Sequence, residues 1–263
     1  MEYGVCSDLS QAAILKKAGF DYLELNVQRD LKPELPDDDF QPVLELINAS
    51  PLPCRCANCF IPGHLKLTGD NVNSELLSQY VTVACARAAL AGIDTIVFGS
   101  GAARCVPDGF DREEARAQLI LFVRQAGDIA HGSGITLCVE PLNRAECNIL
   151  NRVEETARFV IEAAHPRVHL LVDAYHWDRE NELAEPIIIH QERLSHTHIA
   201  TYRERKAPGL EPCDFDEFFS ALAHAGYDGR MSIEGQWDSL DKEAAHALAV
   251  LKDCERAVQE LLL

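Results

Sequence analysis

Short apolar runs alternate with longer amphipathic segments along the whole chain, and this alternation limits the possible folds more than any other feature. Eight runs of four to six residues, bounded by Gly, Pro, Asp or Asn, have the composition of strands. The predicted strands cover residues 3–6, 22–26, 53–57, 94–98, 136–140, 169–173, 194–199 and 230–234. Helical spacing of apolar residues is found over 73–91, 112–130, 153–164, 214–225 and 242–261.

Eight strand–helix alternations predict a parallel sheet, and eight is the number of strands that closes into a (β/α)₈ or TIM barrel. No linker, low-complexity run or charge block divides the chain, so we expect a single domain over residues 1–263. An open doubly wound sheet would show the same alternation. However, the Gly-rich segment GSGAAR lacks the spacing of a Rossmann dinucleotide-binding turn. Predicted capping residues are Asn73, which is weak, and Asp214 with Glu217.

The charge and hydropathy of the chain exclude several classes of partner. A net charge of −18 repels a phosphate backbone, so nucleic acid is not an expected partner. The longest apolar stretches are far too short to cross a bilayer, so no membrane is expected either. Glu2 and Asp8 stand where a signal peptide would have a basic region, and we therefore expect a soluble cytoplasmic protein.

The ten cysteines are scattered, which favours reduced thiols in the cytosol. Cys54, Cys56 and Cys59 form one local group in PCRCANCF. Their C-x-C-x-x-C spacing has no second cysteine pair and no nearby histidine, as a zinc site would need. We therefore interpret Cys54 and Cys56 as small apolar side chains in a strand of the barrel wall.

The last four predicted strands each carry, at or near the C-terminal end, a side chain that can bind a metal ion. TLCVE, HLLVD, SHTHI and RMSIE place Glu140, Asp173, His198 and Glu234 there, 33, 25 and 36 residues apart. Each interval is about one strand–helix unit, and active sites of such barrels lie at the C-terminal ends of the strands. This donor set suits one divalent ion, with manganese, cobalt, magnesium and zinc all compatible.

Each of these carboxylates, taken alone, would be better explained as a helix cap or a surface group at a strand end. Four ligand-type residues in succession, each at the end of an apolar strand, are hard to explain in that way. Three carboxylates buried at one rim would also repel one another strongly without a cation. The sequence therefore predicts a metal site at the mouth of the barrel.

Two histidines compete for the ligand position on the seventh strand, because His196 and His198 point to the same side. His198 is nearer the C-terminal end and is the predicted ligand, with His196 one layer below it. His176 follows Asp173 by three residues in DAYHWD, in the predicted loop at the mouth. There it could donate to a substrate oxygen, whereas the alternative is a merely packed histidine.

Longer motifs match a known family. VEPLNRAECN, LLVDAYHWD, HTHIATYRERKAPG and SIEGQW lie in the C-terminal half, and AGFDYLELNV, IPG and VFGSGAARCVPDGF in the N-terminal half. The chain resembles the sugar phosphate isomerase/epimerase family of xylose isomerase-like TIM barrels, which includes ketose 3-epimerases. The resemblance implies an enzyme of carbohydrate metabolism with one divalent metal ion, a small carbohydrate substrate and a homo-oligomeric state.

The resemblance also assigns roles to the four strand-end residues. It implies that Glu140 and Glu234 are both metal ligands and the catalytic acid/base pair. Asp173 and His198 are ligands only. The implied reaction is a proton transfer next to a carbonyl, through a metal-stabilised enediolate, on a ketose or a related sugar or sugar phosphate. Two bases would give an epimerase, and one base shuttling the proton between neighbouring carbons would give an aldose–ketose isomerase.

Three further residues match the family's substrate contacts. These are Glu146, which follows Glu140 by six residues, His176, and Arg205, which lies three residues before a Pro-Gly. The segment after His198 is one residue longer than the epimerase pattern, and Ala-Thr stands where Gly-Glu is expected. The far end of the substrate is therefore expected to differ from that of a free ketohexose. A phosphate group would need a basic or Gly-rich mouth, for which GSGAAR with Arg104 is a candidate.

Other functions on the same fold remain as alternatives. A dehydratase acting on an inosose or a dehydroshikimate-like substrate would begin with abstraction of the same kind of proton. An abasic-site endonuclease would need extra histidines on the early strands and a basic groove. The first four strand ends offer Glu24, Asn26 and Asn58 but no histidine, and the chain is acidic. A non-catalytic sugar-binding barrel would be favoured if no metal bound.

Overall fold

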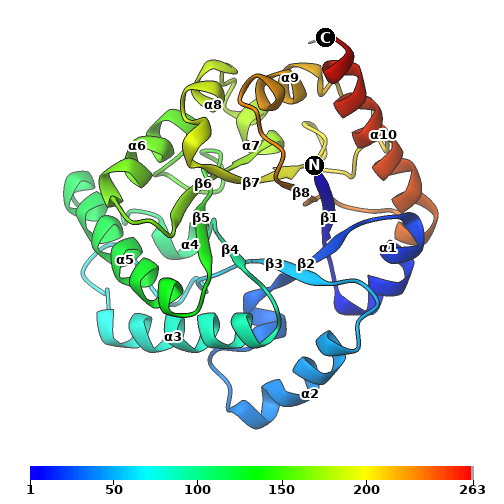
Figure 1. The fold of residues 1–263 in the computed structure, drawn as a ribbon. Helices are drawn as coiled ribbons and strands as arrows, with labels where there is room; N and C mark the ends of the chain where they lie inside the picture. Colours follow the sequence, from blue (N-terminus) through cyan, green and yellow to red (C-terminus); the bar gives the residue numbers. More distant parts are fainter. Residues whose placement is uncertain (262–263) are drawn as a thin grey trace.

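The computed structural model describes residues 1–261, in which eight parallel strands close into a barrel in chain order (Figure 1). The predicted (β/α)₈ TIM barrel is therefore confirmed. Every observed strand boundary lies within one residue of its prediction. The strands are β1 (Glu2–Cys6), β2 (Tyr22–Asn26), β3 (Cys54–Asn58), β4 (Thr95–Phe98), β5 (Thr136–Val139), β6 (Val168–Asp173), β7 (Leu194–Ile199) and β8 (Arg230–Ile233).

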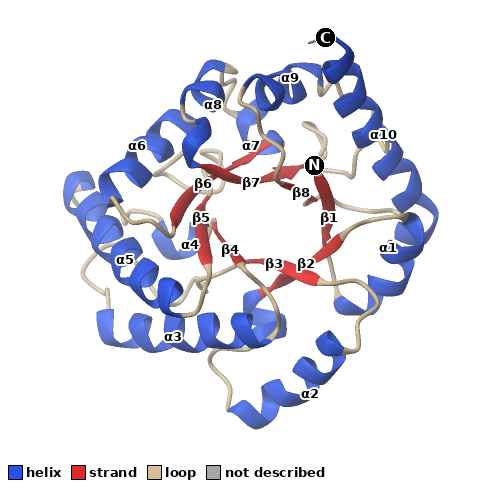
Figure 2. Ribbon diagram, in the orientation of Figure 1, coloured by secondary structure: helices blue, strands red, loops and turns tan. Residues whose placement is uncertain are grey.

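Helices form a ring around the strands, as Figure 2 shows. The longer ones are α1 (Ala12–Ala18), α2 (Asp37–Asn48), α3 (Ser74–Leu90), α5 (Arg112–Gly132), α6 (Val153–Ala163), α9 (Asp216–His224) and α10 (Leu240–Leu261). Short turns lie between them: η1 (Leu9–Gln11), η2 (Val27–Leu31), α4 (Gly101–Arg104), α7 (Ala174–Arg179), α8 (Glu185–Ile189) and η3 (Gln191–Arg193). No helix among residues 1–261 combines the length and the apolar character needed to span a membrane.

Two of the longer helices were not expected from the sequence, and one expected cap is wrong. The helix α1 has only seven residues, and α2 carries Pro42 in its interior, where proline usually ends a helix. The Asn73 side chain accepts a hydrogen bond from the Leu76 amide and caps α3. Asp214 is not the N-cap of α9, because its carboxylate bonds the Asp216 amide in a turn just ahead of the helix.

The strands are buried on both faces, and the two faces have different neighbours. Ile96 and Phe98 of β4 join the large apolar core between the barrel and its helices. Val97, which points the other way, forms a separate small apolar cluster with Cys138 and Leu171. Buried polar side chains from β2, β7 and β8 also meet inside the barrel, where Glu24 bonds His196, His198 and Ser232.

The cysteines agree with their structural interpretation. All ten are free thiols, and Cys54 and Cys56 are buried on β3. Cys59 lies beyond the strand and is exposed. No group of possible metal ligands within the described residues combines these three cysteines.

Candidate metal centre and active site

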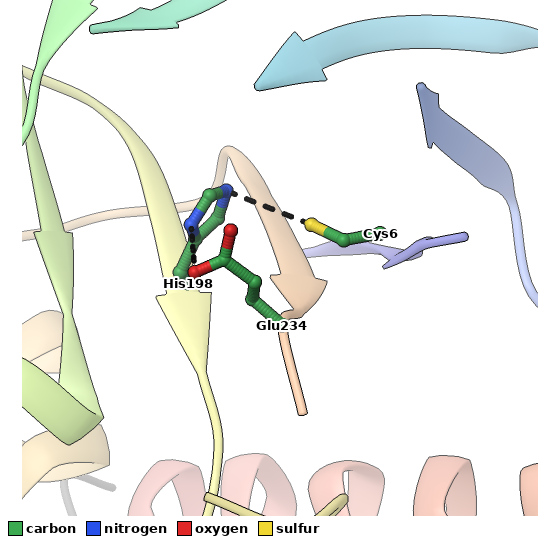
Figure 3. Close-up of side chains that lie close together, drawn as sticks. All are labelled: Cys6, His198 and Glu234. Atoms are coloured by element: carbon green, nitrogen blue, oxygen red, sulfur yellow. Dashed lines mark hydrogen bonds and ion pairs between the residues drawn. The ribbon is translucent and has the colours of Figure 1, made fainter. Parts of the chain in front are cut away.

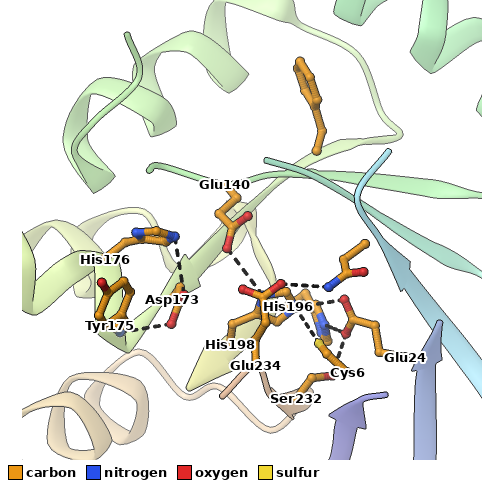
Figure 4. A network of polar contacts seen from close by, with 12 residues as sticks. Cys6, Glu24, Glu140, Asp173, Tyr175, His176, His196, His198, Ser232 and Glu234 are labelled. Atoms are coloured by element: carbon orange, nitrogen blue, oxygen red, sulfur yellow. Dashed lines mark hydrogen bonds and ion pairs between the residues drawn. The ribbon is translucent and has the colours of Figure 1, made fainter. Parts of the chain in front are cut away.

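Four possible metal ligands meet at the C-terminal ends of the last four strands (Figure 4). Glu140 follows β5, Asp173 ends β6, His198 is the fifth residue of β7, and Glu234 follows β8. One nitrogen or oxygen atom from each lies within 4.8 Å of those of the others. Ligands about 2.0–2.2 Å from one ion lie about 3–4 Å apart, so this donor set can surround a single divalent ion.

Several of these atoms are buried without a hydrogen-bond partner within residues 1–261. They are Oε1 of Glu140, Oδ2 of Asp173 and Nδ1 of His198. Buried polar atoms are nearly always paired, because leaving one unpaired costs its lost hydration. Three such atoms around one point are what a metal-binding site requires, and the residues present therefore fit a divalent cation.

His198 lies between the carboxylates at the mouth and another carboxylate deeper in the barrel. Its Nδ1 is 3.4 Å from Oε1 of Glu140 and 3.6 Å from Oε2 of Glu234. Its Nε2 is 2.9 Å from Oε1 of Glu24, and the Cys6 sulfur is 4.0 Å from the same nitrogen (Figure 3). The two ring nitrogens therefore face different environments, and Nδ1 is the one directed at Glu140 and Glu234.

The protonation of the site reflects its crowded negative charge. Burial and the neighbouring carboxylates raise the pKa of Asp173 to about 7, although Arg205 opposes this shift. Burial also raises the pKa of Glu140, whereas His198 and Arg205 outweigh burial at Glu234 and lower its pKa to about 2. A cation would offset the repulsion that raises the pKa values of Asp173 and Glu140.

The protonation of His198 depends on the same negatively charged neighbours. Burial lowers the pKa of His198, but Glu24 and other acidic groups outweigh it and raise this pKa well above its ordinary value. Burial raises the pKa of Glu24, but the two histidines beside it lower it far below its usual range. Without a metal ion, a protonated His198 balances part of the charge, and a metal ion would replace that proton.

His176 is placed as a hydrogen-bond donor at the edge of the site. Its Nδ1 accepts from the backbone amide of Asn143 at 3.2 Å and from its side-chain amide at 2.8 Å. Because burial lowers the pKa of His176 to about 3, the ring is neutral and Nε2 carries its proton. This Nε2 lies 3.7 Å from Asp173 and 4.0 Å from Glu146 and has no hydrogen-bond partner within residues 1–261.

Arg205 points into the site and contacts several of its acidic residues. Its guanidinium is 2.5 Å from Glu234, 3.4 Å from Glu146 and 3.7 Å from Asp173. It also stacks over the ring of Tyr175, 4.7 Å from the centroid. Arg203, two residues earlier, bonds Glu204 and Glu211 and is 76% exposed. The structure thus brings Arg205, and not Arg203, to the metal ligands.

A cavity of about 310 Å³ is lined by two of the four possible ligands, Glu140 and Glu234. Its lining includes Glu140, Glu234, Glu146, His176 and Arg205, together with the Gly-rich turn 99–102. The volume is sufficient for a small sugar and too small for a large cofactor.

The structure contradicts the suggestion that Arg104 could bind a phosphate. Arg104 is fully buried, and its guanidinium donates to the backbone carbonyls of Phe98, Glu140 and Leu150. These bonds hold the end of β5, from which Glu140 projects. The segment GSGAAR therefore supports the wall of the cavity and does not present a cation to it.

Sequence reasoning did not assign roles to several residues that contact the site. Glu24 bonds His196 and His198, Asn58 donates to Oε1 of Glu234 at 2.7 Å, and Asn143 orients His176. The signal for Glu24 was a glutamate inside the apolar strand YLELN. Its partners could not be named, because they lie more than 170 residues away along the chain.

The sequence has relatives among sugar epimerases. The model of the xylose isomerase-like TIM barrel family matches residues 12–254. A ketose 3-epimerase of Arthrobacter globiformis is 31% identical over 161 residues, 54% of this chain and 55% of the relative. A 3-dehydro-D-guloside 4-epimerase of Escherichia coli is 30% identical over 50% of this chain and 51% of that protein. The chain therefore spans about half the length of the curated relatives it matches.

Solved structures agree with the fold over nearly the whole chain. A D-psicose 3-epimerase of Clostridium cellulolyticum, solved with D-tagatose, superposes with a TM-score of 0.83. It is 20% identical, and the match covers 98% of this chain and 99% of that one. The apo 3-keto-D-glucoside 4-epimerase of E. coli gives 0.81 at 22% identity, over 97% of this chain and 100% of that one. At these identities the superpositions support the barrel architecture alone.

Proposed function

The chain belongs to the xylose isomerase-like TIM barrel family, and on this premise we propose that it is a divalent-metal-dependent epimerase or isomerase of a small sugar. The substrate is a ketose or a related carbonyl sugar. The reaction is a proton transfer at the carbon next to the carbonyl. One observation carries the proposal: unpaired, buried ligand atoms of Glu140, Asp173 and His198 converge beside a sugar-sized cavity.

Glu140, Asp173, His198 and Glu234 would hold the ion, which as manganese, cobalt, magnesium or zinc is compatible with this donor set. When bound, the ion supplies Lewis-acid polarisation of the carbonyl and its neighbouring hydroxyl oxygen. The chain itself supplies the proton transfer. Glu140 and Glu234 enter the cavity from different strands, so one can remove the proton and the other can return one.

The remaining residues would bind and orient the sugar. His176 presents an N–H that no protein atom within residues 1–261 accepts, and this N–H suits a substrate oxygen. Glu146 and Arg205 line the same cavity and can accept from and donate to sugar hydroxyls. Hydrogen bonding of this kind discriminates strongly between sugars, because an unmatched buried polar group costs binding energy.

The names of the relatives favour epimerisation or isomerisation over the dehydratase alternative. Ketose 3-epimerases stand beside a hydroxypyruvate isomerase of E. coli, which is 24% identical over 49% of this chain. An epimerase needs two bases on opposite faces of the reacting carbon, and the pair Glu140 and Glu234 supplies two. We therefore place epimerisation of a ketose first and aldose–ketose isomerisation second.

The test is exchange of the substrate proton with solvent. A panel of free and phosphorylated ketoses is incubated in D₂O with the enzyme and Mn²⁺, which is removed before NMR spectra are recorded. We expect deuterium at the carbon next to the carbonyl, and the product identifies epimerase or isomerase. Glu140→Gln serves as the matched variant without the proposed base.

The opposite result is also informative. If Mn²⁺ binding is confirmed by calorimetry and no ketose in the panel exchanges a proton, the proposed reaction is wrong. A deoxygenated or unsaturated product would instead establish a dehydratase.

A further inference from the structure

Glu24 lies inside the barrel, beneath the four proposed metal ligands, with only 1% of its surface exposed. It comes from β2, whereas the groups that it contacts come from β7 and β8 (Figure 4). Its two oxygens lie 2.8 and 2.9 Å from Nε2 of His196 and Nε2 of His198. A carboxylate buried to this degree is stable only when its hydrogen-bonding positions are filled, which here depends on side chains from across the barrel.

The two oxygens of Glu24 accept hydrogen bonds from different partners. Oε1 accepts from Nε2 of His198 at 2.9 Å. Oε2 accepts from Nε2 of His196 at 2.8 Å and from the hydroxyl of Ser232 at 2.6 Å. The Ser232 hydroxyl is in turn 2.8 Å from the hydroxyl of Tyr22. Two donors thus anchor one oxygen and leave the other directed at the metal-ligand histidine.

This contact determines which nitrogen of His198 is available to an ion. An ionised carboxylate can only accept, so Nε2 of His198 must donate and therefore carries a proton. In the neutral imidazole the lone pair is then on Nδ1, the nitrogen that faces Glu140 and Glu234. If the proton were on Nδ1, it would point at the ion and His198 could not be a ligand in this orientation.

We propose that Glu24 is a positioning residue that holds His198 with its proton on Nε2 and its Nδ1 lone pair toward the metal ion. The bond from His196 holds the carboxylate in this orientation, and Ser232 only adds a second donor to the same oxygen. The inference rests on the proposed metal-dependent function and adds a residue that determines how tightly the ion is held. Partners of this kind behind a ligand histidine set its orientation and its basicity.

Three variants separate this role from general stability. Glu24→Met keeps the length of the side chain and removes the acceptor, so we expect the Kd for Mn²⁺ to rise about 10- to 100-fold. Glu24→Gln keeps one acceptor. Its amide oxygen can face His198 while its NH₂ faces His196, which can move its own proton to the unpaired Nδ1. A smaller loss is therefore expected.

Ser232→Ala is the matched control, because it removes a hydrogen bond from the same carboxylate but from the other oxygen. We expect its Kd for Mn²⁺ to stay close to that of the wild type. Titration calorimetry measures the affinities, and thermal unfolding without metal shows which variants are folded. In the Zn²⁺-loaded wild type, ¹⁵N NMR of histidine should find the His198 proton on Nε2.

The inference is overturned if folded Glu24→Met binds Mn²⁺ as tightly as Ser232→Ala, or if NMR places the proton on Nδ1 in the loaded wild type. If Glu24→Met does not fold, Glu24→Gln takes its place in the comparison with Ser232→Ala. The inference is then overturned by equal affinities of these two variants or by a proton on Nδ1 in the NMR spectra. Failure of the proposed function looks different: the wild type itself would then bind no Mn²⁺, which would overturn both. Wild-type binding that is unaffected in the Glu24 variants overturns the positioning role alone.

Discussion

The two ends of the barrel differ in how their charged side chains are paired. At the N-terminal ends of the strands, which we call the floor, Arg230 bonds Asp94 through both guanidinium amino groups at 2.5 and 2.8 Å. Arg230 also contacts Glu2, and Arg55 lies 4.0 Å from Asp94. At the C-terminal mouth, Arg205 faces three carboxylates, those of Glu146, Asp173 and Glu234, while Glu140 and Asp173 retain buried oxygens without a hydrogen-bond partner among residues 1–261. At the floor the acidic side chains are paired with arginines, whereas at the mouth the negative charge is not fully compensated.

The comparison shows which end serves stability and which end serves function. The acidic groups at the floor are neutralised by arginines of the same chain, so no bound ion is needed there. At the mouth, burial and mutual repulsion raise the pKa values of Glu140 and Asp173, so the ionised forms of both groups are disfavoured. Such an arrangement costs stability, and a cation bound there would offset this cost. Changes at the mouth should therefore alter chemistry far more than folding, and changes at the floor the reverse.

The largest effect is expected from the two glutamates at the mouth. Glu140→Gln and Glu234→Gln should each lower kcat by roughly 10³-fold or more, because each removes a proton-transfer group together with a ligand charge. In contrast, the metal-free Glu140→Gln protein should melt no lower than the wild type, since a buried, repelled carboxylate has been neutralised. Steady-state kinetics and calorimetric melting measure both. Full activity in either variant would remove that residue from the acid/base pair.

A smaller change at the mouth should displace a ligand without removing it. At Gly99, directly after β4, an added Cβ would overlap Oε2 of Glu140, the mobile end of that side chain. Gly99→Ala should therefore shift the carboxylate and lower kcat/KM by about 10²-fold, with little loss of stability.

Gly132→Ala is the control for this change, since a Cβ there meets nothing within 4 Å. Equal kinetics in the two alanine variants would show that the position of the Glu140 carboxylate is not critical.

The arginine at the mouth, Arg205, should affect mainly the affinity for substrate. Arg205→Ala removes a donor in the cavity, and we expect KM to rise about tenfold, as for loss of one charged hydrogen bond. Arg203→Ala, two residues away on the exposed side of the same loop, should leave KM unchanged. A rise in KM for Arg203→Ala and not for Arg205→Ala would mean that this loop adopts a different register around the substrate.

The sequence predicted the residues of the mouth better than those of the floor. The four possible ligands could be found because each lies at or near the end of an apolar strand, and the order of strands in a barrel brings successive ends together. They are Glu140, Asp173, His198 and Glu234. Arg104 was misjudged, since nothing in GSGAAR shows that its side chain turns inward to bond carbonyls. The pairing of Arg230 with Asp94 and of Glu24 with the histidines depends on barrel closure, which juxtaposes residues with no local relation in the sequence.

The smallest effect is expected at the floor, where it should appear in stability alone. Partial burial raises the pKa of Asp94, but hydrogen bonds from Arg230 and Thr95 outweigh it, so the folded pKa lies below its usual value. The stabilisation is therefore complete above the unfolded pKa of about 4 and is lost as the pH falls through the folded pKa. Asp94→Asn should cost about 0.5 kcal/mol at pH 7, allowing for the exposure of the pair. In urea unfolding the difference should stay constant down to about pH 5 and shrink at lower pH, while kcat is unchanged. A lower kcat in this variant would show that the floor and the mouth are coupled, contrary to the division of tasks that their charges indicate.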